Sequence, residues 1–498
     1  MIDKLELRRS RWTFRIAAVV FGLCWFIVFE WICSLLNWGN PWDQEDAFVG
    51  FSSIHPLFVL SDDKDSMTIP ISRRKFFVEE SFPADKSTDT FRIFCLGGST
   101  VQGRPYSTQT SFTTWLAIAM QETTPNRNWE IINCGGISYA SYRLAPILEE
   151  VLTYQPDMII LCSGHNEFLE DRSYSSIKYK PSRFRKVHEF ASSFRTFQMI
   201  RKTLNGFTSM KKLESGDGDR PVMTADADAL LDYHNGIKAY HRDEDWRMDV
   251  ISHYEYNLRR MQSMCDSADV PLLLMLPPSN LRDSPPFKSQ HGDSLNPEAL
   301  NTWKGHIEKA ESLYRDDLDG ALQFLKKALD LDDRYAITYY SMGKVLEAKG
   351  WFREATNAYE KAREEDVCPL RILKEMEASL RRIAHDTGSP LIDIHKLLEK
   401  HCSWNIMSNE MLVDHIHPSI RGHQMIAMEV ARSMIEKHNI KVSADWKSQC
   451  ELSFGKHLKS MSDLYFLKGK QNLENLKAWT QGRADGHPIE TRIEFPNP

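Results

Sequence analysis

The stretch FRIFCLGGST, residues 91–100, decides the fold that we predict for this chain. It joins a short apolar run to a glycine-rich turn, and the same arrangement returns in WEIINCGGIS (129–138) and DMIILCSGHN (157–166). Two further apolar runs follow, VPLLLMLPP (270–278) and SPLIDIH (389–395). Short apolar runs that are bounded by Gly, Pro and Ser indicate buried β-strands.

Helical patterns alternate with these strands. The first three strands are separated by SFTTWLAIAMQET (111–123) and LAPILEEVLTYQP (144–156). An alternation of strands and helices predicts an α/β fold, in which a parallel sheet is covered by helices on both faces. In such sheets the active site lies at the carboxyl ends of the strands.

The composition limits the possible functions. A chain of 498 residues is too long for one ordinary domain, so we expect two or three units. With 42% hydrophobic and 26% charged residues, the chain has the composition of a folded globular protein. The net charge of −6 is small for this length and gives no reason to expect nucleic acid as a partner.

The N-terminus predicts a membrane anchor. Residues 1–15 form a basic segment, and residues 16–38 form an apolar run that is long enough to cross a bilayer, although Glu30 interrupts it. A cleaved signal peptide is the alternative, but no A-x-A-like site follows the run. Because the basic residues precede the helix, we expect a single-pass anchor with the rest of the chain outside the cytoplasm, in the periplasm if the cell is bacterial.

Several segments flank or interrupt the predicted sheet. Residues 39–90 are interpreted as a linker and N-terminal extension, with a hairpin around ISRRKFFVEESF (71–82). Residues 170–250 are polar and contain a basic, aromatic helix candidate at 178–202, either a lid, a surface for anionic polymers or headgroups, or a solvated helix face. Residues 438–498 are predicted to be a helical extension with no assigned role.

Residues 300–366 show an internal repeat and divide the predicted catalytic domain into two parts, 91–299 and 367–437. Small residues that recur at a period of 34 are typical of tetratricopeptide helix pairs. Since about one and a half repeats are recognisable and about three are needed for independent stability, we expect this insert to rest on the catalytic domain. An ordinary helical hairpin is the alternative. The recurring residues are Ala321, Leu325 and Ala328, then Ala355, Tyr359 and Ala362.

The stretch DHIHPSIRGH (414–423) places one Asp and three His within ten positions. Asp414 and His417 are three residues apart, so the carboxylate can bind one imidazole nitrogen and leave the other as a base. A base needs a nucleophile, and Ser99 lies on the glycine turn that ends the first strand. Asn166 follows the third strand, and the turn after the second strand can present a backbone N–H. We expect these groups to meet at one edge of the sheet.

GGST (97–100), GHN (164–166) and DHIHP (414–418), in this order and on these elements, resemble the SGNH (GDSL-like) hydrolase superfamily. The resemblance covers residues 90–200 and 250–435. It implies a three-layer α/β/α, flavodoxin-like parallel sheet and a serine hydrolase that acts on carboxylic esters.

The resemblance also assigns roles to individual residues. Ser99 corresponds to the nucleophile, His417 to the base and Asp414 to the carboxylate that orients it. Asn166 corresponds to the side-chain donor of the oxyanion hole, in which hydrogen bonds stabilise the developing negative charge.

The second motif departs from the family pattern. The family usually has Asn-x-Gly-x-x-Gly, but this chain has Ser138 at the last position. Since a backbone donor works with any residue that tolerates the geometry, we expect the N–H groups of Ser99 and of Ser138, or of its neighbour Gly135, to complete the oxyanion hole.

The implied reaction is acyl transfer through an acyl-Ser99 intermediate. Water releases the acyl group in an esterase, whereas a sugar hydroxyl accepts it in an O-acyltransferase, and both alternatives stay open. By analogy with anchored enzymes of this superfamily outside the cytoplasm, the candidate substrate is an acylated polysaccharide, with O-acetyl groups as the ester.

Two other classes of function are weighed against this one. Asp414, His415, His417 and His423 could bind a metal ion, but metal-binding loops usually need a second cluster elsewhere and HExxH is absent, so we expect no metal ion and no cofactor. The other class is an anchored scaffold that binds a protein partner through residues 300–366. The intact Ser, Asn, Asp and His of the motifs argue against a decayed site.

The remaining residues of interest have simpler interpretations. Nine cysteines include no CxxC pair, which argues against zinc ribbons and thioredoxin-like chemistry. Cys95, Cys134 and Cys162 lie at the ends of the strand-like runs, where we expect them to be core residues. Tyr139 and Glu167, next to the motif residues, are candidates for specificity.

Overall fold

The structure is a computed structural model in which two compact units are formed by residues 1–50 with 172–223, and 51–171 with 224–498. The helix predicted at 178–202 falls almost entirely outside the described residues. The residues described are 2–36, 38, 46, 49–51, 53–171, 194–196, 199, 222–232, 236–437 and 439–480.

The first unit contains one long helix, α1 (Ile2–Leu35). Its segment Ala17–Leu35 is long and apolar enough to cross a membrane and is almost entirely exposed, and it lies inside the span predicted from the sequence. Glu30 interrupts this segment, but its carboxylate accepts hydrogen bonds from the backbone N–H groups of Arg195 (3.0 Å) and Thr196 (2.6 Å).

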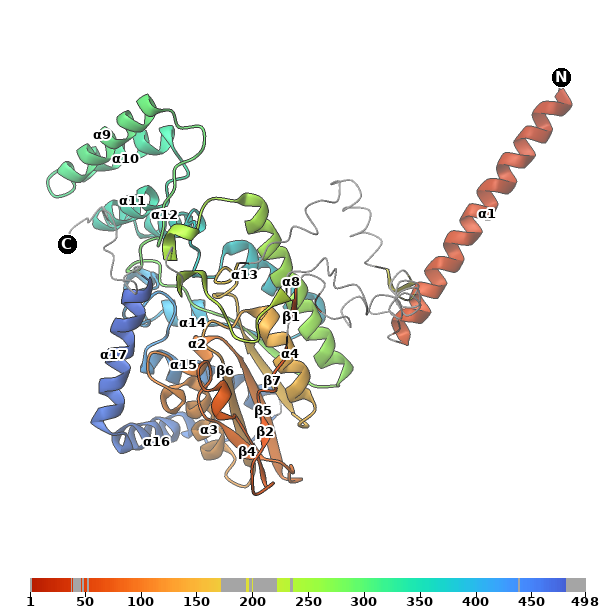
Figure 1. Cartoon of the computed structure of the whole chain (residues 1–498), viewed down its shortest axis with the longest axis horizontal. Helices are drawn as coiled ribbons and strands as arrows, with labels where there is room; N and C mark the ends of the chain where they lie inside the picture. Colours follow the sequence, from red (N-terminus) through yellow and green to blue (C-terminus); the bar gives the residue numbers. More distant parts are fainter. Residues whose placement is uncertain are drawn as a thin grey trace. The chain divides into compact units, whose positions relative to one another are not determined.

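A five-stranded parallel sheet forms the centre of the second unit (Figure 1). In spatial order its strands are β10 (Leu391–Asp393), β9 (Leu272–Leu276), β7 (Met158–Cys162), β5 (Thr90–Gly97) and β6 (Asn128–Gly135), and every neighbouring pair is parallel. The chain runs from β5 to β6 and then crosses to β7, so its winding direction reverses beside β5. Open α/β sheets bind ligands at such a reversal, outside the carboxyl ends of the strands.

Burial explains why these segments form strands. All residues of β5, β7 and β9 are buried, as expected for strands of a parallel sheet that is covered on both faces. The five strands predicted from the sequence are confirmed. Cys95, Cys134 and Cys162 are buried free thiols on these strands, so their interpretation as core residues is confirmed too.

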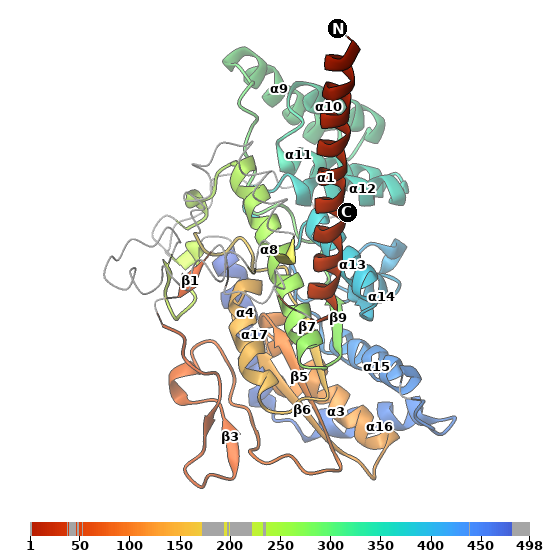
Figure 2. The ribbon, with the colours of Figure 1, turned by 90° about the vertical axis from the view of Figure 1, so that its right-hand side faces the viewer.

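Helices cover both faces of the sheet, as Figures 1 and 2 show. On one face, the helix Phe112–Thr123 packs on β6 and on the helix Ile420–Lys437, and on the other face the helix Ser141–Leu152 packs on β5 and on the helix Glu244–Ser267. The predicted three-layer α/β/α fold class is therefore confirmed. The first layer contains α3 (Phe112–Thr123), α15 (Ile420–Lys437) and α16 (Trp446–Ser460), and the second contains α4 (Ser141–Leu152), α8 (Glu244–Ser267) and α13 (Lys374–Thr387).

Most of the segment predicted as a linker belongs to the sheet unit. Phe58 and Phe82 lie with their ring centroids 6.2 and 5.2 Å from that of Phe94 on β5. These contacts tie a small antiparallel sheet to the core. Its strands are β2 (Val59–Leu60), β3 (Ser66–Thr68) and β4 (Ser81–Pro83).

The hairpin predicted at residues 71–82 is displaced. β3 pairs with β4, and most of the predicted hairpin is the connection between them, which begins with the 3₁₀ helix η1 (Ile71–Arg73). Pro70 precedes η1 and has no N–H to donate to a neighbouring strand, so strand pairing stops before it.

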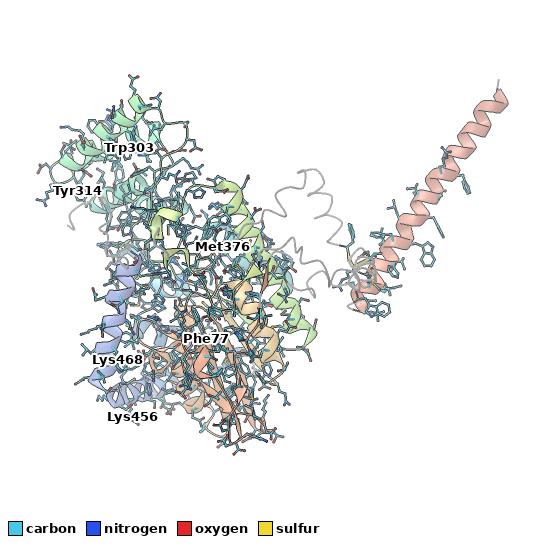
Figure 3. The ribbon with its side chains drawn as sticks, in the orientation of Figure 1. Phe77, Trp303, Tyr314, Met376, Lys456 and Lys468 are labelled. Carbon is cyan, nitrogen blue, oxygen red and sulfur yellow. The ribbon has the colours of Figure 1, made fainter. Side chains whose placement is uncertain are left out.

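Four helices form the insert predicted at residues 300–366, and each packs on the next along the chain. Trp303 and Tyr314, labelled in Figure 3, belong to their common core. The six residues predicted to recur at 34 positions are all buried, although the tetratricopeptide character itself stays a prediction. The helices are α9 (Pro297–Leu313), α10 (Leu318–Leu331), α11 (Ala336–Ala348) and α12 (Phe352–Glu364).

The insert rests on the sheet domain, as we expected. Leu281 and Ile406, which lie outside the four helices, complete the insert's hydrophobic core. Arg282 forms an ion pair with Glu347 of α11 at 2.7 Å, and its backbone oxygen accepts a hydrogen bond from the Tyr340 hydroxyl at 2.7 Å.

Of the predicted C-terminal extension, the described residues 439–480 contain the helices α16 and α17 (Asp463–Thr480), and residues 481–498 lie outside the described part. Short elements complete the fold. They are β1 (Gly50–Phe51), α2 (Ser99–Gln102), η2 (Thr108–Thr110), β8 (Val222–Met223), η3 (Leu230–Asp232), η4 (Gly236–Ala239), α14 (Ile394–Glu399) and η5 (Ser403–Asn405).

Candidate active site

Ser99 lies at the carboxyl end of the central strand. β5 ends at Gly97, and Ser99 begins α2 after Gly98. A Cβ atom on Gly98 would lie 2.5 Å from Asn166 Nδ2, so glycine is needed for the turn to approach that side chain. The turn therefore holds Ser99 beside Asn166, at the edge where the winding of the sheet reverses.

The loop before α15 brings a histidine and a carboxylate to this serine. His417 Nε2 lies 2.8 Å from Ser99 Oγ, and His417 Nδ1 lies 2.7 Å from Asp414 Oδ2. Because an ionised carboxylate only accepts hydrogen bonds, Nδ1 carries the imidazole proton and Nε2 is an acceptor. The hydroxyl of Ser99 therefore donates to His417, which is the geometry of a nucleophile, a base and an orienting carboxylate.

Backbone groups fix the carboxylate in this arrangement. Asp414 Oδ1 accepts hydrogen bonds from the N–H groups of Ile416 and His417, each at 2.8 Å. Burial raises the pKa of Asp414, but His417, His415 and these hydrogen bonds outweigh that effect and hold the pKa well below its usual range. The ionised carboxylate keeps His417 in one orientation.

Three donors beside Ser99 could stabilise an oxyanion. Asn166 Nδ2 donates one hydrogen to the backbone oxygen of Tyr139 at 3.0 Å and has a second hydrogen available. Within the described part of the chain, the backbone N–H groups of Ser99 and Ser138 have no hydrogen-bond acceptor. These are the three donors that the sequence motifs indicate.

Gly135 and Ser138 differ in what their N–H groups do. The N–H of Gly135 donates to Asn133 Oδ1 at 2.9 Å, so it is already engaged, whereas Ser138 lines the cavity beside Ser99. Ser138 has a φ of 62°, in the left-handed region that glycine adopts without strain. This conformation explains why the family pattern has glycine at the position, and it favours Ser138 over Gly135 as the backbone donor.

A cavity of about 310 Å³ opens beside Ser99. It is lined by Ser99, His417 and Asn166. The charged residues Lys75, Arg104 and Asp232 line it as well. Part of its wall comes from α17, for which the sequence suggested no role. The apolar lining includes Phe76, Ile137, Leu169, Leu370, Leu476 and Trp479.

Three further histidines are buried near the triad, and burial is the main cause that lowers the pKa of each. His415 lines the cavity, lies 3.7 Å from Asp414 Oδ1 and has a pKa lowered to about 4. His423 instead accepts the Phe112 N–H through Nδ1 at 3.2 Å, with a pKa lowered to about 3. His165 lines the cavity, and its pKa lies well below the usual value.

These histidines do not form a metal cluster with Asp414. Over the described ranges, no group of three or more His, Cys, Asp and Glu side chains is arranged to hold a metal ion. The three histidines instead accept a backbone N–H or line the cavity as neutral groups.

The two residues suggested for specificity have structural roles. Glu167 accepts the backbone N–H and hydroxyl of Ser141 at 2.8 and 2.9 Å, which holds the first residue of α4. Tyr139 accepts a hydrogen bond from Arg73 at 3.1 Å, and neither residue lines the cavity. A role of this pair in specificity stays a prediction.

Arg104 and Trp479 are cavity residues that sequence reasoning missed. Arg104 lies five positions after Ser99, so its proximity could have been noted from the motif. Trp479 lies at the end of the chain's last described helix, and no sequence pattern connects it with Ser99.

No family model and no curated protein matches this chain. Several solved structures that are similar to it carry the names of lipases or esterases. A lipolytic protein of the G-D-S-L family from Desulfitobacterium hafniense DCB-2 is 11% identical, with a TM-score of 0.29 over 68% of this chain and 98% of that chain. The acetylxylan esterase Axe2 from Geobacillus stearothermophilus is 12% identical, with a TM-score of 0.30 over 70% and 95%.

The lipase/acylhydrolase from Enterococcus faecalis is 11% identical, with a TM-score of 0.31 over 71% of this chain and 98% of that chain. At these identities a comparison assigns no role to any residue. The candidate site therefore rests on the geometry of Ser99, His417 and Asp414.

Proposed function

We propose that this protein is a serine esterase that works through an acyl-Ser99 intermediate. The observation that carries the proposal is the hydrogen-bonded series from Ser99 Oγ to His417 (2.8 Å) and on to Asp414 (2.7 Å). The cavity beside Ser99, which can receive an ester, supports it as well.

The reaction follows from these positions. His417 Nε2 takes the hydroxyl proton while Ser99 Oγ attacks the carbonyl carbon of the ester. The N–H groups of Ser99 and Ser138 and the Asn166 amide stabilise the resulting oxyanion. His417 then protonates the departing alcohol oxygen, which leaves the acyl group on Ser99. Water, deprotonated by His417, attacks this acyl group and releases a carboxylic acid and free Ser99.

The substrate class that we carry forward is an O-acyl ester of a polysaccharide, with acetyl as the acyl group. The same intermediate gives an O-acyltransferase if a sugar hydroxyl replaces water in the second half of the reaction. Product analysis separates these activities, because hydrolysis yields free carboxylate whereas transfer yields a new ester and no net acid.

The test uses the full-length protein in a mild detergent, as wild type and as Ser99→Ala. We expect the wild type to hydrolyse p-nitrophenyl acetate and to be labelled by a fluorophosphonate, and we expect both signals to vanish in Ser99→Ala. A folded wild-type protein without turnover or labelling would contradict the esterase proposal and favour an anchored scaffold. Turnover that survives Ser99→Ala but is lost with a chelator would point to a metal site.

We also propose that α1 anchors the protein in a membrane with the sheet unit outside the cytoplasm. The apolar segment Ala17–Leu35 and the basic residues before it support this orientation. In a bacterial host, the full chain should stay in the membrane pellet after carbonate extraction and be digested by protease added to spheroplasts. A chain that is shortened at its N-terminus or resists the protease would contradict the anchor or its orientation.

A further inference from the structure

The charged side chains of the cavity beside Ser99 differ in whether they have partners. Asp232 Oδ1 accepts a hydrogen bond from Trp479 Nε1 at 2.8 Å. Lys75 lies at the rim with 69% of its side chain exposed, and its Nζ is 3.8 Å from Asp226. Each of these two charges is therefore hydrogen-bonded, near an opposite charge or in contact with water.

Arg104 is different. Its side chain is half-buried, and over the described residues it has no hydrogen bond and no ion pair. Burial alone lowers the pKa of Arg104, with no acidic group to offset it. A guanidinium stays protonated in proteins, so the site holds a positive charge that has lost part of its water without gaining a partner.

The same cavity contains a second donor without an acceptor. His165 Nδ1 accepts the backbone N–H of Ile372 at 3.1 Å, so the proton of this neutral imidazole is on Nε2. His165 is 6% exposed, and its Nε2 has no partner among the residues that the structure describes. Burial keeps its pKa well below the usual value, so His165 acts as a donor and not as a base.

We infer that the ester bound beside Ser99 carries a second, anionic oxygen group, such as a carboxylate, which pairs with Arg104. The inference rests on the proposed esterase function and narrows its substrate class to acidic esters. The planar guanidinium fits a carboxylate with two parallel hydrogen bonds. Asp232 lines the same cavity, but over the described residues it forms no ion pair with Arg104.

The experiment compares matched esters on the full-length protein in detergent. p-Nitrophenyl hydrogen succinate and its methyl ester place the anion on the acyl side. 3-Carboxy-4-nitrophenyl acetate and its methyl ester place it on the alcohol side. For each ester, kcat/KM is divided by the rate constant of its hydrolysis by hydroxide, which corrects for intrinsic reactivity. We expect this normalised kcat/KM to be about 10- to 100-fold higher for the acidic member of one pair, the range for a charge-assisted hydrogen bond.

Variants connect this preference with one side chain. Arg104→Gln should reduce the ratio between acidic and neutral ester to near one, and Arg104→Lys should restore part of it. Arg127→Gln is the matched control, because Arg127 is exposed and directly precedes β6 at the opposite end of the sheet. It should leave the ratio as in the wild type. An equal fall for both esters in Arg104→Gln would assign Arg104 a structural role and overturn the inference.

Binding separates this inference from the esterase proposal. Calorimetric titration of Ser99→Ala with each ester should show at least about tenfold tighter binding of the acidic member, a preference that Ser99→Ala/Arg104→Gln should lose. Preferential binding without wild-type turnover would support the acidic ligand while rejecting the esterase. Equal binding and equal turnover of acidic and neutral esters would overturn the inference while the esterase proposal stands.

Discussion

The edge of the sheet that carries Ser99, His417 and Asn166, here called the candidate catalytic edge, differs from the helical insert in how far apart in sequence its contacting residues lie. Ser99 and His417 are 318 positions apart and meet only when the sheet and the loop before α15 are in place. In the insert, by contrast, each helix packs on the next along the chain. Non-local contacts require the whole domain to close before they form, whereas local helix pairs do not. We therefore expect changes at the edge to alter activity and changes in the insert to alter stability.

The largest effect is expected from Asp414→Asn. One side-chain oxygen can still accept the N–H groups of Ile416 and His417, but the new amide faces His417 Nδ1 and favours the wrong tautomer. We expect kcat for p-nitrophenyl acetate to fall about 10⁴-fold while thermal unfolding of the insert stays unchanged. A loss below about tenfold would mean that the carboxylate does not orient the base.

Asn166→Ala comes next. It removes an amide donor beside Ser99, and one oxyanion donor is typically worth about 2.7–4 kcal/mol, so kcat should fall roughly 100- to 1,000-fold. Asn128→Ala is the control, because Asn128 begins β6 at the opposite end of the sheet and its side chain donates to Thr90 Oγ1 there (2.9 Å). The measurement is kcat of both variants in a stopped assay. An equal loss of kcat in Asn166→Ala and Asn128→Ala would assign Asn166 a structural role.

His423→Gln tests how the burial of a neutral histidine near the triad makes the free energy of unfolding depend on pH. The folded pKa of His423 is lowered to about 3, so native His423 stays neutral while the unfolded chain binds a proton below about pH 6.5. The free energy of unfolding of the wild type therefore decreases as the pH falls below 6.5, at a slope that approaches about 1.4 kcal/mol per pH unit. In the variant, this decrease is absent. Between pH 6.5 and 4.5 the destabilisation by His423→Gln should shrink by about 2.3 kcal/mol, as urea unfolding can measure. His385→Gln, at an exposed site, is the control.

Gly343→Ala should affect the insert alone. A Cβ atom there would lie 2.5 Å from the ring of Tyr359, which is buried between α11 and α12. Such overpacking costs about 1–3 kcal/mol, so the insert should unfold at a lower temperature while kcat at 20–25 °C is retained. Gly305→Ala on α9 meets no atom within 4 Å and should stabilise the helix by about 0.5–1 kcal/mol. A loss of kcat in Gly343→Ala at 20–25 °C would show that the insert also influences activity.

The smallest effect is expected from Ser138→Gly. A non-glycine residue in the left-handed region costs about 1 kcal/mol, and glycine removes this strain at the price of a more flexible unfolded chain. We expect a small rise in the melting temperature and a kcat close to that of the wild type, because the donor is a backbone N–H. A large fall in kcat would show that the Ser138 hydroxyl takes part in the reaction.

The sequence by itself predicted the sheet and the candidate residues Ser99, His417 and Asp414. The five strands could be predicted because buried parallel strands are continuous apolar runs, and their alternation with helices fixes the edge at which Ser99 and Asn166 lie. Asp414 and His417 could be predicted because a local spacing of three residues already brings a carboxylate to an imidazole.

Only the tertiary structure decided what surrounds the triad. The predicted hairpin of residues 71–82 is displaced, and Tyr139 and Glu167 are hydrogen-bonded to Arg73 and Ser141, because such pairings depend on packing that no sequence period encodes. Trp479 reaches the cavity from a helix whose sequence neighbours have no catalytic motif. A motif is local and can be recognised in one stretch of sequence, whereas a cavity is the space left between distant segments and exists only once they have packed.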